Sequence, residues 1–439
     1  MSISTEVCPV TVASRLSALT EELLGSPPPL RLRAWDGSEA GPAGGPVLVV
    51  RRRRALRRTL FRPGELGLAR AWVAGDIDVE GDLYEALTAL TGLVWARPDS
   101  ATVPRSRMAA AVPELLALAG PLPLPVSPPR EENRRRSPGR AHSQRRDRGA
   151  ISHHYDVSNE FYELVLGPSM VYSCAVWGEE TDDLQDAQAA KLDLICRKLG
   201  LREGQRLLDV GCGWGSLVLH AAQRYGVRAV GVTLSTEQAE YARERVAKED
   251  LTDRIEIRVQ DYRRVDDGPF DAISSVGMAE HVGDARYQEY ADRLFRLLRP
   301  GGRLLNHQIA RRPMADESRY RLSPFIDAYV FPDGELAPVG RTLDLLERAG
   351  FEVRDMESLR EHYALTLRHW VRRLEREWDR AVRLVGPARA RIWRLYMAAS
   401  AIQFERGRIG VNQLLAVRTP DDGRAPLPLR PRAWVEPAS

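Results

Sequence analysis

The chain has few cysteines and no Cys-x-x-Cys pair. Its four cysteines, spread over 439 residues, are Cys8, Cys174, Cys196 and Cys212. A disulfide framework or a zinc site needs cysteines grouped at short spacing, so we expect neither, and we expect no bound metal. Scattered cysteines fit a reducing compartment.

Long apolar runs are absent as well. The most apolar stretch, residues 109–126, is broken by Glu114 and by four prolines. A membrane-spanning helix would need about 20 consecutive apolar residues, so none is expected. The residues Met1–Glu6 also lack the charged and then apolar pattern of a secretory leader. We therefore expect a cytoplasmic protein.

A strong excess of one charge is also missing, since 64 lysines and arginines face 60 acidic residues and leave a net charge of +4. Arginines nevertheless gather at residues 51–58 and again at residues 130–148. Such clusters favour an anionic partner, either a phospholipid surface or a nucleic acid. The alternative is a solvated charge run without a partner.

The N-terminal part has a texture of its own. Strand-like segments at residues 30–35 and 47–50 precede short amphipathic helices at residues 66–73 and 82–87, which predicts a small α+β module. Prolines and arginines then dominate residues 121–150, with little that could pack. We expect a module over residues 1–120, a flexible basic linker over 121–150, and a second domain over 151–439.

That second domain alternates strands with helices. Strands are expected at residues 206–209, 229–232, 255–259, 272–276 and 303–307, separated by helices such as 236–248 and 287–298. This order predicts an α/β fold with a doubly wound, mostly parallel sheet, whose ligands bind beyond the carboxyl ends of the strands. The region after Ser323 is expected to be mostly helical and to cap the sheet.

A glycine turn follows the first of these strands. Residues 209–215 read Asp-Val-Gly-Cys-Gly-Trp-Gly. A dinucleotide site would want a third glycine at position 216, where Ser216 stands, and Gly215 comes one residue early. This spacing is more typical of S-adenosylmethionine (SAM) sites. A structural turn without a ligand is the alternative.

Polar residues after the next strands complete the expected cofactor site. SAM sites often have an acid at the end of the second strand that binds the ribose hydroxyls. This chain has none there, so we expect Thr233 or Gln238 to bind the ribose in part. Gln260, Asp261 and Tyr262 follow the third strand and offer a carboxylate and a ring for adenine. These residues could equally be helix caps or turn residues.

Several longer motifs stand together in this chain: His153–Asp156, Tyr172–Ala175, Leu208–Gly215, Gly231–Ser235, Gly277–Gly283, Tyr329–Gly334 and His362–Leu367. On these motifs the chain resembles the SAM-dependent cyclopropane-fatty-acyl-phospholipid synthase family and its mycolic-acid relatives. The resemblance covers about residues 150–418. Residues 20–100 resemble the family's lipid-facing N-terminal module more loosely.

The resemblance implies roles for individual residues. The residues that would line the SAM site are Tyr172, Ser173, Gly211, Gly213, Thr233, Gln238, Gln260, Asp261 and Tyr262. Asp209 is added to this cofactor site from its position alone, where we expect it to order the glycine turn. A bound bicarbonate serves the family as base, and its holders would be Cys174, Glu280, His307, Ile309 and Tyr363. The chain departs from the family pattern at Ala279, where bulky aromatics are frequent, and at Gln308, where a small hydroxyl residue is common.

The reaction implied is transfer of one carbon from SAM to the cis double bond of an unsaturated phospholipid chain through a carbocation. Loss of a proton from the new methyl with ring closure gives a cyclopropane. A preceding hydride shift gives instead a 10-methylene chain, which in actinobacterial relatives a flavin-dependent reductase converts to 10-methyl. This chain carries no second nucleotide motif, so such a reductase would be a separate partner.

Two other classes of protein remain as alternatives. A nucleic-acid methyltransferase would also join a SAM fold to basic runs, but the Asn/Asp-Pro-Pro-aromatic signature of amino-methylating enzymes is absent, and we expect no nucleic-acid partner. A non-catalytic lipid-binding protein would not need an intact cofactor turn. We expect the basic clusters to hold the enzyme peripherally at the inner face of an anionic membrane.

Overall fold

The structure is a computed structural model that describes residues 10–95, 105–120, 124–132, 158–179, 183–429 and 432. The chain forms two compact units. The first comprises residues 1–133, 323–329 and 386–402, and the second comprises residues 134–322, 330–385 and 403–439. Most of the expected basic linker and the motif His153–Asp156 lie outside the described residues, and the domain boundaries given above stay a prediction.

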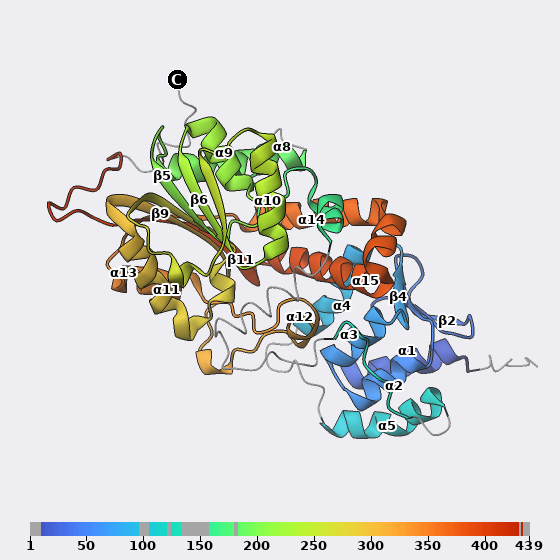
Figure 1. Cartoon of the computed structure of the whole chain (residues 1–439). Coiled ribbons are helices and arrows are strands. Elements are labelled where there is room, and N and C mark those ends of the chain that lie inside the picture. Colours follow the sequence, from blue (N-terminus) through green and yellow to red (C-terminus); the bar gives the residue numbers. More distant parts are fainter. Residues whose placement is uncertain are drawn as a thin grey trace, which may run out of the picture. The chain divides into compact units, whose positions relative to one another are not determined.

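The first unit combines a small sheet with helices, as expected for an α+β module (Figure 1). Its elements are α1 (Val12–Leu24), β1 (Arg31–Arg33), β2 (Glu39–Ala40), β3 (Val47–Val50), α2 (Arg54–Phe61), α3 (Glu65–Val73), β4 (Ile77–Glu80), α4 (Leu83–Trp95), α5 (Arg105–Ala119), α12 (Pro324–Tyr329) and the second part of α15 (Trp378–Glu405). The strand order is β2-β1-β3-β4. Leu16, Leu32, Ala71 and Leu115 are buried together in its core.

Helix α15 enters this unit at a kink. Gly386 has a φ of 79° inside the helix, and the boundary between the units falls at this residue. Beyond the kink, the indole nitrogen of Trp72 donates to the carbonyl oxygen of Arg391 at 2.9 Å, and the Arg391 guanidinium pairs with Asp78 at 3.0 Å. Side chains of α3 and β4 therefore fix this C-terminal segment.

Part of the arginine cluster at residues 51–58 has partners inside the same unit. The fully buried carboxylate of Asp76 pairs with Arg58 at 2.9 Å and with Arg54 at 3.1 Å. A buried carboxylate needs such cations, so Arg58, which is itself buried, serves the fold. Arg51 and Arg54 remain about half exposed.

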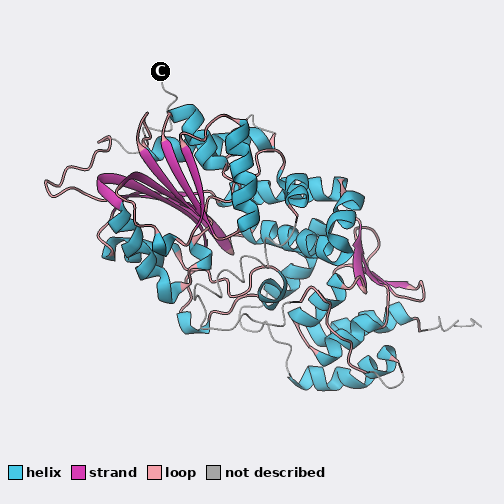
Figure 2. Cartoon of the chain, in the orientation of Figure 1, coloured by secondary structure: helices cyan, strands magenta, loops and turns pink. Residues whose placement is uncertain are grey.

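A seven-stranded sheet forms the centre of the second unit (Figure 2). Its strands are β5 (Arg206–Val210), β6 (Arg228–Thr233), β7 (Ile255–Val259), β8 (Phe270–Val276), β9 (Leu298–Arg311), β10 (Glu352–Ser358) and β11 (Ile409–Val417), in the order β10-β11-β9-β8-β5-β6-β7. β5 to β9 run parallel, and β11 is antiparallel to both of its neighbours. The predicted doubly wound, mostly parallel sheet is confirmed.

Helices cover both faces of this sheet, and in Figure 1 α8, α9 and α10 lie on the opposite side from α11 and α13. The helices of the second unit are α7 (Asn159–Leu166), α8 (Leu184–Leu199), α9 (Ser216–Tyr225), α10 (Thr236–Lys248), α11 (Asp284–Leu297), α13 (Val339–Arg348), α14 (Arg360–Arg376) and the first part of α15, with short 3₁₀ turns η1 (Tyr262–Arg264), η2 (Ala279–His281) and η3 (Glu317–Arg319). Leu207 packs with α8 to α10, whereas Leu208 packs with α11 and α13. The alternation of side chains along a strand thus gives each face its own core.

The region after Ser323 is mostly helical, as expected, but it also contains two strands that the sequence analysis did not predict. Besides α12 to α15 it supplies two strands, β10 and β11, that complete the sheet. β10, an edge strand, is rich in charged residues, and two polar residues in the middle of β11 interrupt its apolar sequence, so neither reads as a continuous apolar strand.

Candidate active site

A cavity of about 130 Å³ lies beyond the carboxyl ends of β5, β6 and β8, where an open α/β sheet binds ligands. Every residue expected to hold the cofactor lines it: Tyr172, Ser173, Asp209, Gly211, Gly213, Thr233, Gln238, Gln260, Asp261 and Tyr262. These residues come from four separate segments of the chain. The fold therefore brings together the residues that the sequence assigns to one site.

The glycine turn between β5 and α9 has the backbone that its sequence predicts. Gly211, Gly213 and Gly215 have φ values of 82°, 54° and 81°, a region that residues with side chains rarely adopt. A β-carbon at Gly213 would meet nothing within 4 Å, and one at Gly211 would lie 3.4 Å from Met278. The turn thus leaves space for a ligand to approach the backbone.

Asp209 ends β5 beneath this turn. The Ser274 hydroxyl donates to its carboxylate at 2.8 Å. Burial raises the pKa of Asp209 to about 6, while the Ser274 hydrogen bond and the charge of nearby Lys191 act in the opposite direction. Asp209 is therefore a buried acid next to the glycine turn, held by a hydrogen bond from β8.

Helix α8 holds Ser173 from the other side of the cavity. The ammonium of Lys191 donates to the Ser173 hydroxyl at 3.0 Å, and the Gln188 amide donates to the Ser173 carbonyl at 2.9 Å. Burial lowers the pKa of Lys191 to about 8, and the nearby Asp209 carboxylate acts in the opposite direction. Neither Lys191 nor Gln188 was predicted from the sequence. Their spacing of three places them on the buried face of an amphipathic helix, where polar side chains are unusual and indicate a site.

The residues after β6 and β7 form hydrogen bonds of their own. The Thr233 hydroxyl donates to the Gln238 side-chain oxygen at 2.9 Å. The Asp261 carboxylate caps η1 and pairs with Arg263 at 2.6 Å. Asp261 thus acts as a turn residue and also lines the cavity, and its contact with a ligand stays a prediction.

A row of aromatic rings runs along the cavity and continues beyond it. Trp214, which lines it, lies 4.6 Å from Tyr162 between ring centroids; Tyr162 lies 5.8 Å from Tyr172, and Tyr172 lies 5.4 Å from Trp370. Trp370 in turn meets Tyr363 edge to face at 6.0 Å. The row connects the glycine turn with one of the five residues expected to hold bicarbonate.

Those five residues belong to one group of contacts. The Glu280 carboxylate accepts the Ile309 backbone N–H at 2.7 Å. The Leu359 carbonyl accepts the Cys174 thiol at 3.6 Å and the Tyr363 backbone N–H at 3.1 Å. Leu359 is joined in turn to Val411, which pairs with Ile309 between β11 and β9. His307 lies two residues before Ile309 on β9, so its side chain is on the same face.

Two buried polar atoms of this group have no hydrogen-bond partner among the described residues. They are Oε2 of Glu280 and Nε2 of His307. Burial raises the pKa of Glu280 to about 7 against the hydrogen bond from Ile309. Burial also lowers the pKa of His307 to about 3, assisted by the charges of Lys191 and Lys198. A buried polar atom without a partner is costly, so each of these two atoms is a candidate contact for a small polar ligand.

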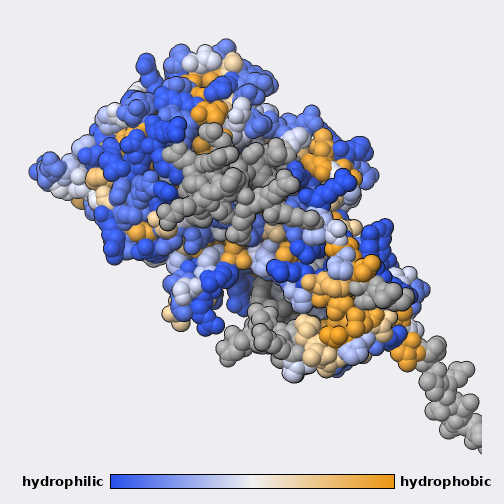
Figure 3. Space-filling view, turned by 60° about the horizontal axis from the view of Figure 1, so that its bottom comes forward, coloured by the Kyte–Doolittle hydropathy of each residue, from blue (hydrophilic) through white to orange (hydrophobic). Residues whose placement is uncertain are grey.

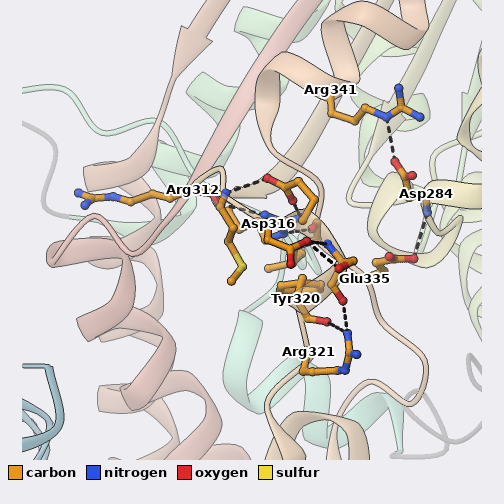
Figure 4. A network of polar contacts seen from close by, with 12 residues as sticks. Asp284, Arg312, Asp316, Tyr320, Arg321, Glu335 and Arg341 are labelled. Atoms are coloured by element: carbon orange, nitrogen blue, oxygen red, sulfur yellow. Dashed lines mark hydrogen bonds and ion pairs between the residues drawn. The ribbon is translucent and has the colours of Figure 1, made fainter. Parts of the chain in front are cut away.

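The turn that carries Glu280 is joined to a polar network whose members Asp284, Glu335 and Arg341 are labelled in Figure 4. The backbone N–H of Glu335 donates to the Glu280 carbonyl at 3.1 Å, and the Glu335 carboxylate accepts the Asp284 N–H at 3.1 Å. Arg341 then pairs with Asp284 at 3.1 Å. The turn that carries Glu280 is thus fixed by contacts on both sides. Met278, His281 and Val282 of the same turn line the cofactor cavity.

Comparisons with known proteins place this geometry in a family. The family model described as mycolic acid cyclopropane synthetase matches residues 142–414. The chain belongs to this family.

Individual relatives and solved structures support this assignment to the family. A probable fatty acid methyltransferase of Mycobacterium tuberculosis is 44% identical over 93% of this chain and 95% of its own length. Tuberculostearic acid methyltransferase of the same organism is 33% identical over 93% of this chain and 91% of its own. The crystal structure of mycolic acid cyclopropane synthase CmaA1 with S-adenosylhomocysteine (SAH) and CTAB covers 62% of this chain and 98% of its own at 34% identity, with a TM-score of 0.58.

The family settles the class of enzyme and its cofactor. The protein is a SAM-dependent methyltransferase, and the glycine turn, Asp209 and the aromatic residues provide a cavity that suits SAM. Its family transfers one-carbon groups to lipid acyl chains. None of the described helices is long and apolar enough to cross a membrane.

Proposed function

We propose that the protein transfers one carbon from SAM to the cis double bond of an unsaturated acyl chain in a phospholipid, through a carbocation, with bicarbonate as the base. The observation that carries this proposal is the pair of buried, unpartnered atoms on Glu280 and His307 beside the cofactor cavity. Membership of a lipid-modifying family supports the choice of substrate.

The chemistry explains why these residues are needed. An alkene is a poor nucleophile, so the cofactor methyl and the double bond must be held in line and away from water. SAM supplies the electrophilic methyl. Aromatic rings such as Tyr172 and Tyr262 stabilise positive charge nearby.

The proton that leaves the new methyl needs an acceptor, which bound bicarbonate would supply. The side chains of Cys174, Glu280, His307 and Tyr363 and the backbone of Ile309 would hold this anion. With a pKa of about 7, Glu280 retains a proton in much of the population near neutral pH and can bind an anion through that proton. Two bare carboxylate-like charges in contact would repel, so Glu280 orients the anion and does not act as the base itself.

The product is a cyclopropane in our first proposal. A 10-methylene chain, reduced to 10-methyl by a flavin-dependent partner, is the second candidate. One observation favours it: the relatives that match this chain over nearly its whole length are named fatty acid and tuberculostearic acid methyltransferases. Either product arises from the same cation, so the site residues have the same roles in both.

Mass spectrometry of fatty acids after incubation with SAM and oleoyl phospholipid vesicles tests the proposal. We expect a gain of one CH2 unit, with fragmentation distinguishing a ring from an exocyclic alkene, and repeating the reaction with a flavin reductase reveals a methyl branch. Depletion of bicarbonate should slow turnover and its return should restore it. Glu280→Gln should lose most turnover and keep SAM affinity. Absence of any mass gain, or turnover indifferent to Glu280, would contradict the proposal.

A further inference from the structure

A row of polar side chains crosses three strands behind His307. Gln413 of β11 is the register partner of His307 on β9, and Glu357 of β10 is the register partner of Gln413. Register partners in antiparallel strands project their side chains on the same face and in contact. Lys198, from the last turn of α8, reaches into this row.

Hydrogen bonds give the row a direction. The Lys198 ammonium donates to the Glu357 carboxylate at 2.5 Å and to the side-chain oxygen of Gln413 at 2.9 Å. The Gln413 amide nitrogen lies 3.3 Å from Nδ1 of His307. Lys198 and Gln413 are fully buried, and His307 is 2% exposed, so water cannot easily replace these contacts.

The chemistry of the four groups fixes the position of one proton. An ammonium has donors only, so the Gln413 oxygen must face Lys198 and the amide N–H must face His307. An amide N–H requires an acceptor, and Nδ1 of a neutral imidazole accepts only when the proton is on Nε2. The opposite tautomer would place two donors against each other in a dry core, which is costly.

We propose that Lys198 and Gln413 are positioning residues that lock His307 as the Nε2–H tautomer, so that its buried Nε2 is a permanent hydrogen-bond donor to the anion of the active site. Nε2 is the atom that has no partner among the described residues. This inference rests on the proposed function for the identity of the anion, but the tautomer itself does not depend on it. His307 then holds the anion and does not take up the substrate's proton.

The arrangement depends on side chains from β10, β11 and α8. Gln413 has the right rotamer only while Lys198 holds its oxygen, and Lys198 stays charged in the core because Glu357 and Asp355 lie at 2.5 Å and 3.8 Å from its nitrogen. Such outer residues commonly fix the tautomer of a histidine that binds a ligand through its other nitrogen.

Nuclear magnetic resonance of the full-length protein with isotope-labelled histidine nitrogens tests the proposal without any turnover. The chain has eight histidines, and the His307 signal is assigned by its loss in His307→Gln. At neutral pH we expect a neutral ring with the proton on Nε2. A proton on Nδ1 in the unaltered protein would overturn the proposal.

Gln413→Glu is the decisive variant because it changes the hydrogen bonding and almost none of the volume. A carboxylate only accepts, so it should move a proton to Nδ1 of His307, and the bicarbonate concentration for half-maximal turnover should rise roughly 10–100-fold. SAM affinity, measured by calorimetry, should stay the same. Lys198→Met should release the Gln413 amide and give a mixture of tautomers.

The matched control is Asn412→Asp, the same amide-to-acid change one residue earlier on β11, where the side chain lies on the other face of the sheet. It should leave the His307 tautomer unchanged. An unchanged tautomer in Gln413→Glu would overturn the inference, and if that variant does not fold, the tautomer in the unaltered protein decides. A correct tautomer in an enzyme whose turnover ignores bicarbonate would instead contradict the proposed function.

Discussion

Glu280 carries a buried carboxyl group whose ionisation should weaken the fold at alkaline pH. Its pKa is raised from an ordinary value of 4.5 to about 7, so folding favours the protonated form. Its contribution to stability is therefore complete below about pH 4.5 and is lost as the pH rises through 7. Glu280→Gln, which stays neutral and keeps an oxygen for the Ile309 N–H, should remove this loss.

We expect Glu280→Gln to raise the free energy of unfolding at pH 8 by about 2 kcal/mol and to change it little at pH 4.5. Denaturant unfolding of both proteins at the two pH values measures the difference. Glu240→Gln, at an exposed position on α10, is the matched control and should show no such pH dependence. Equal stability of the two proteins at pH 8 would mean that the Glu280 carboxyl group is better solvated than its surroundings indicate.

The sequence allowed most of the cofactor residues to be predicted because they lie at or shortly after a strand end, whereas Tyr172 and Ser173 were assigned from the family resemblance alone. Gly211, Gly213 and Thr233 are read from short motifs next to apolar runs, and a parallel sheet brings such ends together. Gln413 and Lys198 could not be found in this way. Their role depends on which residues of β9 and β11 are register partners, and local sequence does not determine that.

Gln308 illustrates the same limit. It differs from the family pattern beside His307, yet its side chain lies on the opposite face of β9. There it accepts from the Tyr287 hydroxyl at 2.6 Å and donates to Thr342 at 2.7 Å. Gln308, although unusual for the family, therefore has hydrogen-bond partners of its own and does not face the site. The sequence alone gave no means of deciding between the two faces.

At the scale of elements, helix α8 carries a buried lysine, Lys191, that lowers the stability of the fold and holds Ser173 at the cofactor cavity. The pKa of this lysine is lowered from 10.5 to about 8, so the folded protein disfavours its charged form. This penalty is present at neutral pH and disappears as the pH rises from about 8 towards 10.5. A helix selected for stability alone would carry an apolar residue at this position.

Lys191→Met should therefore unfold at the same temperature as the unaltered protein or a higher one at pH 7, because Asp209 then takes up a proton. The same change should weaken SAM binding about tenfold, since the Ser173 hydroxyl loses its charged donor. Thermal unfolding and calorimetric titration with SAM measure the two effects. The exposed Lys248→Met on α10 is the control and should alter neither. Unchanged SAM affinity in Lys191→Met would show that α8 only supports the fold.

Over the whole molecule, the surface of the first unit is the part best suited to a lipid interface. Large apolar side chains are exposed there at Phe61, Leu68, Leu116 and Leu124, to 46%, 53%, 39% and 71%. Three of them lie on α2, α3 and α5, and both α3 and α5 pack against α2. Figure 3 shows apolar residues gathered on the first unit, at the lower right of the view. Arg58 is paired with Asp76 and is not available to lipid. Attraction to a bilayer should therefore depend on the exposed apolar side chains as well as on the other arginines.

We expect the protein to bind vesicles peripherally, and more strongly when they contain anionic lipid, since its net charge is positive. Leu68→Asp should lower the partition coefficient about tenfold, because it replaces apolar area that would be buried in the interface by a charge. Sedimentation with lipid vesicles at low and high salt measures both effects. Leu365→Asp, a change of the same kind on the exposed side of α14 in the second unit, is the control and should bind as the unaltered protein does. If binding does not depend on salt or on anionic lipid, the arginines do not contribute to membrane binding. If Leu68→Asp and Leu365→Asp bind equally, Leu68 on α3 does not contribute either.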